Sequence, residues 1–204
     1  MERFSVVVAD PPWRYELYSD AGETKAPQRH YKCLGIEDII DLPVADIVEK
    51  DAVLFLWATN PLLDVAFDVI KAWGFKYTTK VEWVKMCQDG TRIRCGTGYR
   101  VLGATEPLLI ATRGNVFCPR KGTRLPGVII APRPLDPSTK RMKHSAKPPN
   151  QWTYFEQYPG RKIELFARDA RLGWTTLGNE IDGRDIRDSL PEVARQFNPQ
   201  LTLL

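Results

Sequence analysis

Short apolar runs alternate with stretches of helical spacing along most of the chain. Apolar segments bounded by Gly, Pro or charged residues predict strands at 4–10, 52–59, 76–86, 106–114, 127–132 and 161–168 and at the start of 173–190. Helical spacing, or boundaries of Pro and Gly, predicts helices at 35–51 with a break near Pro43, at 60–75, at 148–160 and at the end of 173–190. Asn60 is expected to cap the helix 60–75. This alternation predicts an α/β fold, a mixed sheet covered by helices on both faces.

The first apolar run ends in a stiff corner, VVVADPPW at residues 6–13. Three consecutive valines are typical of a strand that is buried on both faces. Pro11 stops the strand because it has no N–H to donate, and it favours an extended backbone at Asp10. We therefore expect a carboxylate at the carboxyl end of a strand, beside the Trp13 indole. Open α/β sheets bind ligands at that edge, although a plain turn after a strand is the simpler alternative.

Length and composition predict one globular domain over residues 1–204. The chain is 43% hydrophobic and 26% charged, which is an ordinary globular balance. The apolar run AVLFLWA at 52–58 is far shorter than a membrane span. The start, MERFSVVVAD, lacks the basic beginning and the long apolar core of a signal peptide. We expect a cytoplasmic protein with no membrane partner.

The few cysteines and histidines argue against a metal site. The four cysteines form no CxxC pair, and the chain contains two histidines. These residues are Cys33, Cys87, Cys95, Cys118, His30 and His144. Their spacing does not match a structural zinc site, so free thiols and no bound metal are expected.

Charge is distributed unevenly along the chain. Between Arg113 and Lys147 there are nine basic residues and one acid, Asp136. The net charge of that segment is +8. The net charge of the whole chain is +4, so the remainder of the chain carries −4. A basic segment on an acidic body is typical of a protein that binds a polyanion such as nucleic acid, and a solvated loop is the plain alternative.

The corner at Asp10 suits an exocyclic amine. A carboxylate and nearby carbonyl groups can accept hydrogen bonds from the amine of adenine, and an aromatic ring can stack on a planar base. That amine is a weak nucleophile, so acceptors that orient it contribute to methyl transfer. A base in a helix must leave the stack before it can enter such a site.

Two further motifs carry polar groups that could hold a cofactor. In HSAKPP (144–149), Lys147 could pair with a ligand carboxylate, although it could equally be a solvated lysine. In RKIELFAR (161–168) and WTTLGNEIDG (174–183), a strand ends near Arg168, and Asn179 and Glu180 lie on a Gly-flanked turn. The isolated GTG at 96–98 does not lie between a strand and a helix, so it does not predict a dinucleotide site.

Together and in this order, VVVADPPW, HSAKP, PGRKIELFAR and WTTLGNEIDG resemble the DPPW-class adenine-N6 methyltransferases. This family includes the catalytic subunit of the eukaryotic mRNA adenine-N6 methyltransferase and bacterial and phage members. The resemblance covers residues 4–183. It implies S-adenosylmethionine as methyl donor. It also implies a Rossmann-like class I methyltransferase fold with permuted motif order: the catalytic strand comes first and the cofactor strand lies near the C-terminus.

The resemblance also assigns roles to individual residues. Asp10 and Pro11 would accept from the target amine, Pro12 would shape the corner, and Trp13 would line the base pocket. The cofactor would contact Asp10, Lys147, Glu164, Phe166, Arg168, Asn179 and Glu180, with Lys147 at its carboxylate. Loops 14–34 and 138–150 would cover the cofactor, and the basic insert at about 113–143 would recognise the target.

The function expected from these observations is S-adenosylmethionine-dependent N6 methylation of adenine in DNA. RNA as substrate, a catalytically silent nucleic-acid-binding subunit and cytosine-N4 methylation are the alternatives; Asp10 favours adenine over cytosine. A second copy of the chain is a further candidate partner. The residues expected to bind nucleic acid are basic: Arg92, Arg94, Arg100, Arg120, Lys121, Arg124, Lys140, Arg141 and Lys143.

Overall fold

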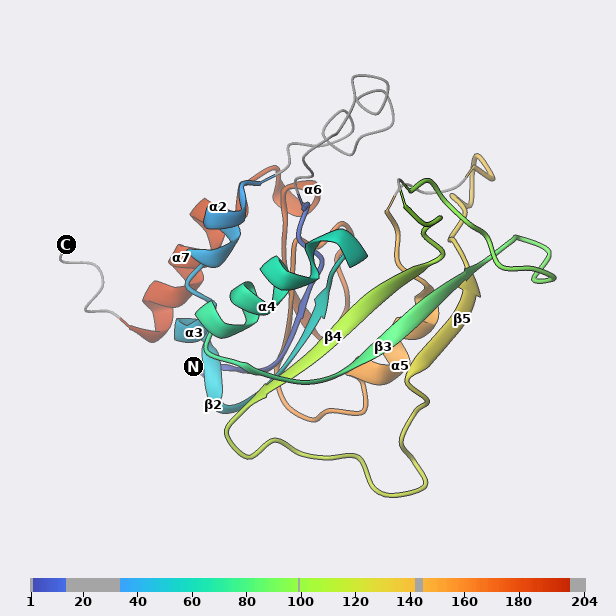
Figure 1. Ribbon diagram of the computed structural model, residues 1–204. Coiled ribbons are helices and arrows are strands. Elements are labelled where there is room, and N and C mark those ends of the chain that lie inside the picture. Colours follow the sequence, from blue (N-terminus) through green and yellow to red (C-terminus); the bar gives the residue numbers. More distant parts are fainter. Residues whose placement is uncertain (1, 14–33, 99, 142–144, 199–204) are drawn as a thin grey trace.

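A computed structural model describes residues 2–13, 34–98, 100–141 and 145–198 and shows a seven-stranded sheet (Figure 1). The strand order is β5-β3-β4-β2-β1-β6-β7. The strands are β1 (Phe4–Ala9), β2 (Val48–Trp57), β3 (Lys76–Met86), β4 (Thr105–Arg113), β5 (Val128–Pro132), β6 (Lys162–Leu165) and β7 (Trp174–Leu177). Within this sheet, β4 runs against the other six strands, because β2 and β3 both pair with it in antiparallel register.

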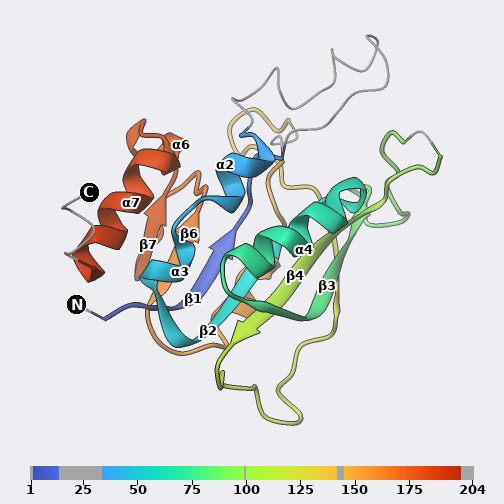
Figure 2. The same ribbon diagram turned by 60° about the vertical axis from the view of Figure 1, so that its left-hand side comes forward.

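Helices lie on both faces of the sheet, and most of them cover one face (Figure 2). That face carries α2 (Ile36–Ile40), α3 (Val44–Ile47), α4 (Leu63–Ala72) and α7 (Ile186–Phe197). The opposite face carries the short α5 (Trp152–Phe155), which follows the 3-10 turn η3 (Pro149–Gln151). A last short helix, α6 (Asn179–Asp182), follows β7. The predicted α/β fold with a mixed sheet is confirmed.

Strand β1 lies at the centre of the two hydrophobic cores. Successive side chains of a strand point to opposite faces of the sheet. Val7 and Ala9 therefore face the core under α4 and α7, whereas Val6 and Val8 face the core under α5. β1 pairs in parallel with β2 and β6. The three consecutive valines therefore fill both cores at once, as the apolar run predicts, and they fix the position at which the strand ends.

Three predicted helices differ from the expectation. The helix predicted at 35–51 ends at Ile47, and residues 48–51 belong to β2. Asn60 does not cap the helix 60–75: residues Asn60–Leu62 form a 3-10 turn, η2, and α4 begins at Leu63. The Asn60 amide instead donates to the carbonyl oxygen of Thr105 at 3.2 Å, so it joins the helix to the start of β4. The predicted helix 148–160 is limited to η3 and α5, because the chain must turn back at Gly160 to enter β6.

The structure describes three of the four cysteines, and Cys87, Cys95 and Cys118 are free thiols. Cys33 lies outside the described residues, as does most of the predicted cofactor loop 14–34. No group of three or more metal-ligating side chains occurs in the described ranges. In the same ranges, no helix has the length and apolar character that would let it span a membrane.

Candidate active site

A cavity of about 1070 Å³, including its open mouth, lies at the edge of the sheet where the parallel strands end. The chain segments that follow β1, β2, β6 and β7 line it, and so does the start of the reversed strand β4. All four residues predicted as catalytic line this cavity: Asp10, Pro11, Pro12 and Trp13. Five predicted cofactor residues beyond Asp10 also line it: Lys147, Phe166, Arg168, Asn179 and Glu180.

The corner after β1 is held rigidly. The Trp13 backbone N–H donates to the Pro11 carbonyl at 2.8 Å, and the Trp13 indole Nε1–H donates to the Trp57 carbonyl at 3.0 Å. Trp13 is only 5% exposed and packs into the core beside Leu34. The indole therefore forms part of the cavity wall and anchors the corner to β2, rather than standing as an open stacking surface.

Four charged side chains of alternating sign form a series that begins in the cavity and ends behind its wall. Lys147 Nζ lies 2.7 Å from Asp10 Oδ1 and 3.6 Å from Glu106 Oε2. Glu106 Oε1 in turn lies 2.5 Å from Lys85 Nζ. The structure thus brings the predicted residues Asp10 and Lys147 together, and it adds Glu106 as a second carboxylate beside Lys147.

These neighbours keep both buried groups charged. Burial alone would lower the pKa of Lys147, but the charges of Asp10 and Glu106 outweigh it, so this pKa is raised above its usual value. For Glu106, burial acts to raise the pKa, and the ammonium groups of Lys147 and Lys85 outweigh that effect, so the pKa is lowered. At neutral pH the cavity therefore contains a compensated set of ionised groups.

The ends of β6 and β7 form the opposite wall of the cavity. The Arg168 guanidinium lies 3.9 Å from a Glu180 carboxylate oxygen. Gly178 packs directly against the chain after β6, where a Cβ atom would be 2.2 Å from the Ala167 carbonyl oxygen. Phe166 has a positive φ of 63°, which is uncommon for an aromatic residue and occurs chiefly where the surrounding structure imposes it. This wall is shaped by close backbone contact.

One buried hydroxyl group in the cavity wall has no partner within the described part of the chain. It is the Thr59 Oγ1, at the end of β2. Buried polar atoms normally make a hydrogen bond, so an unsatisfied one at a cavity wall indicates a ligand that supplies the missing partner. Together with the charged groups of Arg168, Glu180 and Lys147, this hydroxyl fits a polar, charged cofactor.

Glu164 is the predicted cofactor residue that does not line the cavity. It lies on β6 between Val8 and Thr176, on the face of the sheet that carries α5. Burial raises the pKa of Glu164 to about 7. The charge of Arg171 opposes this shift, whereas the charge of Asp10 adds to it. Glu164 therefore lies behind the cavity wall and not in the cavity lining.

The raised pKa of Glu164 predicts that the protein loses stability as the pH rises from about 4.5 to about 7. In that interval the folded state binds more protons than the unfolded state, so the free energy of unfolding falls with pH. Glu164→Gln removes the buried charge. We expect it to raise the free energy of unfolding by up to about 3 kcal/mol at pH 8 and to change it little at pH 4. Urea unfolding at both pH values measures this.

Glu37→Gln is the matched control, because Glu37 is an exposed glutamate on α2. It should have little effect at either pH. An equal gain from Glu164→Gln at pH 4 and pH 8 would contradict a charge effect and would indicate better packing instead.

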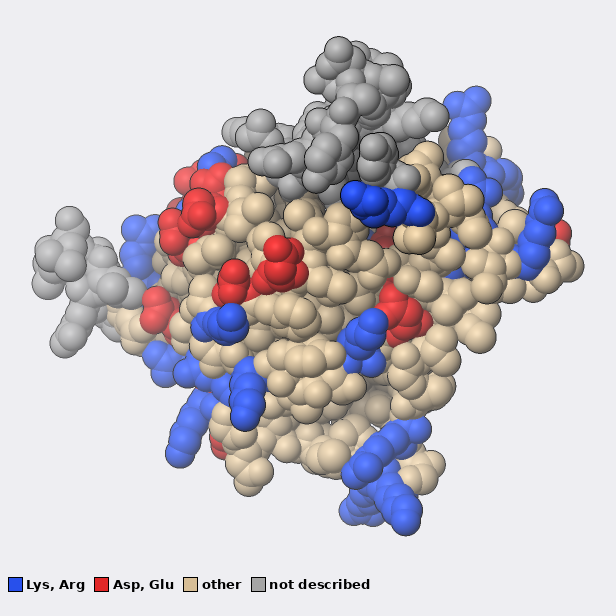
Figure 3. Space-filling view, viewed as in Figure 1, with Lys and Arg blue, Asp and Glu red and all other residues tan. Residues whose placement is uncertain are grey.

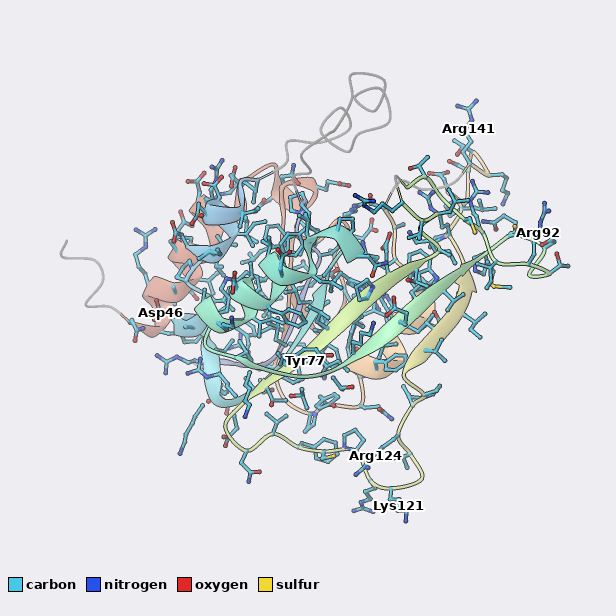
Figure 4. All side chains as sticks on the ribbon, in the orientation of Figure 1. Asp46, Tyr77, Arg92, Lys121, Arg124 and Arg141 are labelled. Carbon is cyan, nitrogen blue, oxygen red and sulfur yellow. The ribbon has the colours of Figure 1, made fainter. Side chains whose placement is uncertain are left out.

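The predicted nucleic-acid residues fall into two groups at opposite ends of the sheet (Figure 4). Arg92, Arg94 and Arg100 lie on the loop 87–104 and Lys140 and Arg141 follow β5, which places them at the end that carries the cavity. Because β4 runs in reverse, the loop 114–127 leaves from the other end, and it carries Arg120, Lys121 and Arg124. Lys143 lies outside the described residues.

The segment 113–143 is consequently divided by β5 and does not form one continuous loop. Figure 3 shows acidic side chains over α2 and α4, and basic side chains both at the loops at the two ends of β5 and on the lower left of the view. The basic side chains are therefore not confined to one side of the molecule, and those near the cavity come partly from loop 87–104.

Several residues that line the cavity were missed by reasoning from sequence, among them Glu106 and Thr59. Glu106 precedes Pro107 at the start of a predicted strand, which is the same order of acid and proline as Asp10 and Pro11. The order of acid and proline would have predicted a place for Glu106 in the cavity only if the reversed direction of β4 had been known, because that direction brings the start of β4 to the cavity end of the sheet. Thr59 carries no comparable sequence signal.

Comparisons with known proteins agree with this geometry. The MT-A70 family model matches residues 4–180. The chain is 30% identical over 200 residues to "N(6)-adenosine-methyltransferase MT-A70-like protein" of Drosophila melanogaster, covering 96% of this chain and 29% of that protein. It is equally 30% identical over 200 residues to the human "N(6)-adenosine-methyltransferase catalytic subunit METTL3", covering 96% and 31%.

A bacterial relative matches over most of its own length. The "Type II methyltransferase M.MunI" of Mycoplasma sp is 27% identical over 206 residues, which cover 91% of this chain and 81% of that protein. The chain spans about a third of the length of the two eukaryotic relatives. Because the family model extends from β1 to α6 and includes every residue that lines the cavity except Asp185 and Ile186, the chain belongs to the MT-A70 family.

Proposed function

We propose that this protein transfers a methyl group from S-adenosylmethionine to the N6 amine of adenine in DNA. The observation that carries the proposal is the Asp10 carboxylate, which is held on a rigid corner at the wall of the cavity, opposite the ends of β6 and β7. Membership of the MT-A70 family supports the same chemistry.

The proposed role of Asp10 is to orient the target amine. Its carboxylate accepts a hydrogen bond from the amine, and the Pro11 carbonyl can accept a second one, because the Trp13 N–H occupies only one of its lone pairs. Acceptors placed on both hydrogens direct the nitrogen lone pair into the cavity. Lys147 compensates the charge of Asp10 and keeps the carboxylate in position.

S-adenosylmethionine supplies the methyl group when bound. The groups proposed to hold it are Arg168, Asn179 and Glu180 at the ends of β6 and β7, together with the unsatisfied Thr59 hydroxyl. Phe166 and the close packing at Gly178 shape this wall. The proposed pairing of Lys147 with the cofactor carboxylate requires Lys147 to share its ammonium with Asp10, to which it is already bound.

DNA is the proposed substrate for two reasons. Basic side chains lie at the cavity end of the molecule on the loop 87–104 and after β5, as expected for a surface that contacts phosphates. In addition, a type II methyltransferase is a relative that the chain covers over 81% of its length. RNA is the alternative substrate, and the two eukaryotic relatives are named for methylation of adenosine.

The experiment that tests this function is transfer of a labelled methyl group from S-adenosylmethionine, with duplex DNA and single-stranded RNA offered in parallel. Digestion to nucleosides should yield N6-methyladenine from the DNA. The same product from RNA alone would overturn the proposed substrate. N4-methylcytosine would overturn the proposed base, and cofactor binding without any product would favour a silent binding subunit.

The two groups of basic residues should differ in their effect on binding to a short duplex. A duplex of about eight base pairs is only about 27 Å long, so when its target lies at the cavity it contacts the nearer group. The double change Arg92→Gln and Arg94→Gln should reduce the slope of log affinity against log salt by about 2. Fluorescence anisotropy over a salt series measures this slope.

The matched double variant, Arg120→Gln with Lys121→Gln, removes the same charge at the far end of the sheet. It should leave the slope on the short duplex unchanged. Equal losses in the two double variants would show that net charge, and not the position of these side chains, determines binding.

The proposed place of action is the cytoplasm of a bacterial or phage-infected cell. A second copy of the chain is a proposed partner in addition to nucleic acid, and sedimentation of the purified protein at two concentrations tests for it.

A further inference from the structure

An ion pair lies directly behind the carboxylate wall of the cavity. Lys85, near the end of β3, places its Nζ 2.5 Å from Glu106 Oε1, whereas Lys147 lies 3.6 Å from the other carboxylate oxygen. The side chains of Lys85 and Glu106 are 20% and 22% exposed. Lys85 is therefore the closest cation to Glu106, although it does not line the cavity itself.

Every charged group that faces Glu106 comes from a different element. Lys85 lies on β3, Lys147 precedes η3, and Arg133 follows β5; all three act to lower the pKa of Glu106, against the effect of burial. Asp10, after β1, competes with Glu106 for Lys147. Without Lys85, Glu106 would depend on an ammonium group that Asp10 holds more closely.

The backbone at Lys85 is also fixed. Its N–H donates to the Ala104 carbonyl at 2.9 Å, and its carbonyl accepts from the Arg94 N–H at 2.7 Å. Its ammonium lies 5.3 Å from the centre of the Trp83 ring. The two backbone hydrogen bonds join Lys85 to both sides of the loop 87–104. The Lys85 side chain is directed at Glu106.

We propose that Lys85 is a positioning residue, which holds Glu106 in place and ionised so that Lys147 remains directed at Asp10. As far as it concerns methyl transfer, this inference rests on the proposed function. A lysine that only added positive charge to the surface would not be largely buried against a carboxylate that lines the cavity, and its replacement would not alter the titration of a group in the cavity.

The same strand provides a matched control. Lys80 Nζ lies 2.6 Å from Glu82, and the Lys80 side chain is 47% exposed. Lys80→Met therefore breaks an ion pair of the same type on β3 without contact with Glu106 or Lys147. Lys85→Arg retains the positive charge. A loss of activity in Lys85→Met that Lys85→Arg does not show therefore arises from the missing charge and not from unfolding.

The first test needs no substrate. In protein labelled with ¹³C at the glutamate carboxyl groups, NMR titration follows Glu106, which is assigned by comparison with Glu106→Gln. We expect Lys85→Met to raise the titration midpoint of Glu106 by about one pH unit or more, and we expect Lys80→Met and Lys85→Arg to leave it near the wild-type value. An unchanged midpoint in Lys85→Met overturns the proposal.

The second test measures methyl transfer against pH. Lys85→Met should lower kcat about tenfold at neutral pH, leave KM for S-adenosylmethionine unchanged and move the acidic limb of the kcat profile to higher pH. Lys85→Arg should restore most of the rate. An equal loss at every pH, or an equal loss in Lys80→Met, overturns the positioning role. If wild-type protein methylates neither DNA nor RNA, the proposed function fails, whereas the NMR titration still decides the role of Lys85.

Discussion

Asp10→Asn is expected to reduce methyl transfer by at least a hundredfold, which corresponds to about 2.7 kcal/mol at the barrier. The amide has the same shape as the carboxylate, but it brings donors to a site that must accept from the target amine. Single-turnover transfer with saturating cofactor measures the loss. Binding of S-adenosylmethionine, followed by calorimetry, should change much less than the rate.

Asp10→Asn is preferable to Asp10→Ala because the Asp10 side chain also forms an ion pair with Lys147. Its partner Lys147 is buried, with a side chain that is 11% exposed, so complete removal of Asp10 would leave a poorly compensated ammonium. Asp64→Asn is the control, since Asp64 is exposed on α4 and does not line the cavity. If Asp10→Asn kept more than about a tenth of the activity, the assigned role of Asp10 would be wrong.

Lys147→Met is expected to lower the free energy of unfolding by about 3–5 kcal/mol at pH 8, and to abolish methyl transfer. The methionine fills a similar volume but leaves the carboxylates of Asp10 and Glu106 facing each other without the cation between them. Urea unfolding of wild type and variant at pH 8 measures the difference.

The pH dependence identifies the cause of that loss. The wild-type pKa of Glu106 is lowered, so its contribution to stability is present above the unfolded value of 4.5 and is lost as the pH falls through the folded value. In Lys147→Met the carboxylate of Glu106 becomes protonated more readily, so the deficit should shrink at pH 4. A deficit of the same size at both pH values would point to lost packing.

Much of the fold follows from local sequence patterns. The run of valines and the Pro pair define β1 and its end, because strand burial and the missing proline N–H act on adjacent residues. The starts of helices follow less directly from local sequence. The Asn60 side chain can cap a helix, but in the structure it donates a hydrogen bond to Thr105, which is distant in sequence. The extent of α5 is likewise determined by where the chain must enter β6.

The site could be predicted in part for the same reason. Asp10, Lys147, Arg168 and Asn179 follow recognisable motifs and line one cavity. Glu106 depends on the direction of β4, and the ion pair between Asp10 and Lys147 joins residues that are 137 positions apart. Likewise, the charge count of 113–147 carries no information about the two ends of β5 to which those charges belong.

The pairing of β1 has a consequence for how the protein forms during synthesis. Val7 of the first strand lies beside Ile163 of β6, 156 positions later in the chain. β1 can pair with β2 as soon as that strand has left the ribosome, but its other edge stays open until almost the whole sheet has been translated. The high sequence separation of these partners favours slow folding, and the pocket for the methyl donor is complete only after β6 and β7 have joined. A nascent chain arrested before residue 160 should therefore be unable to retain S-adenosylmethionine.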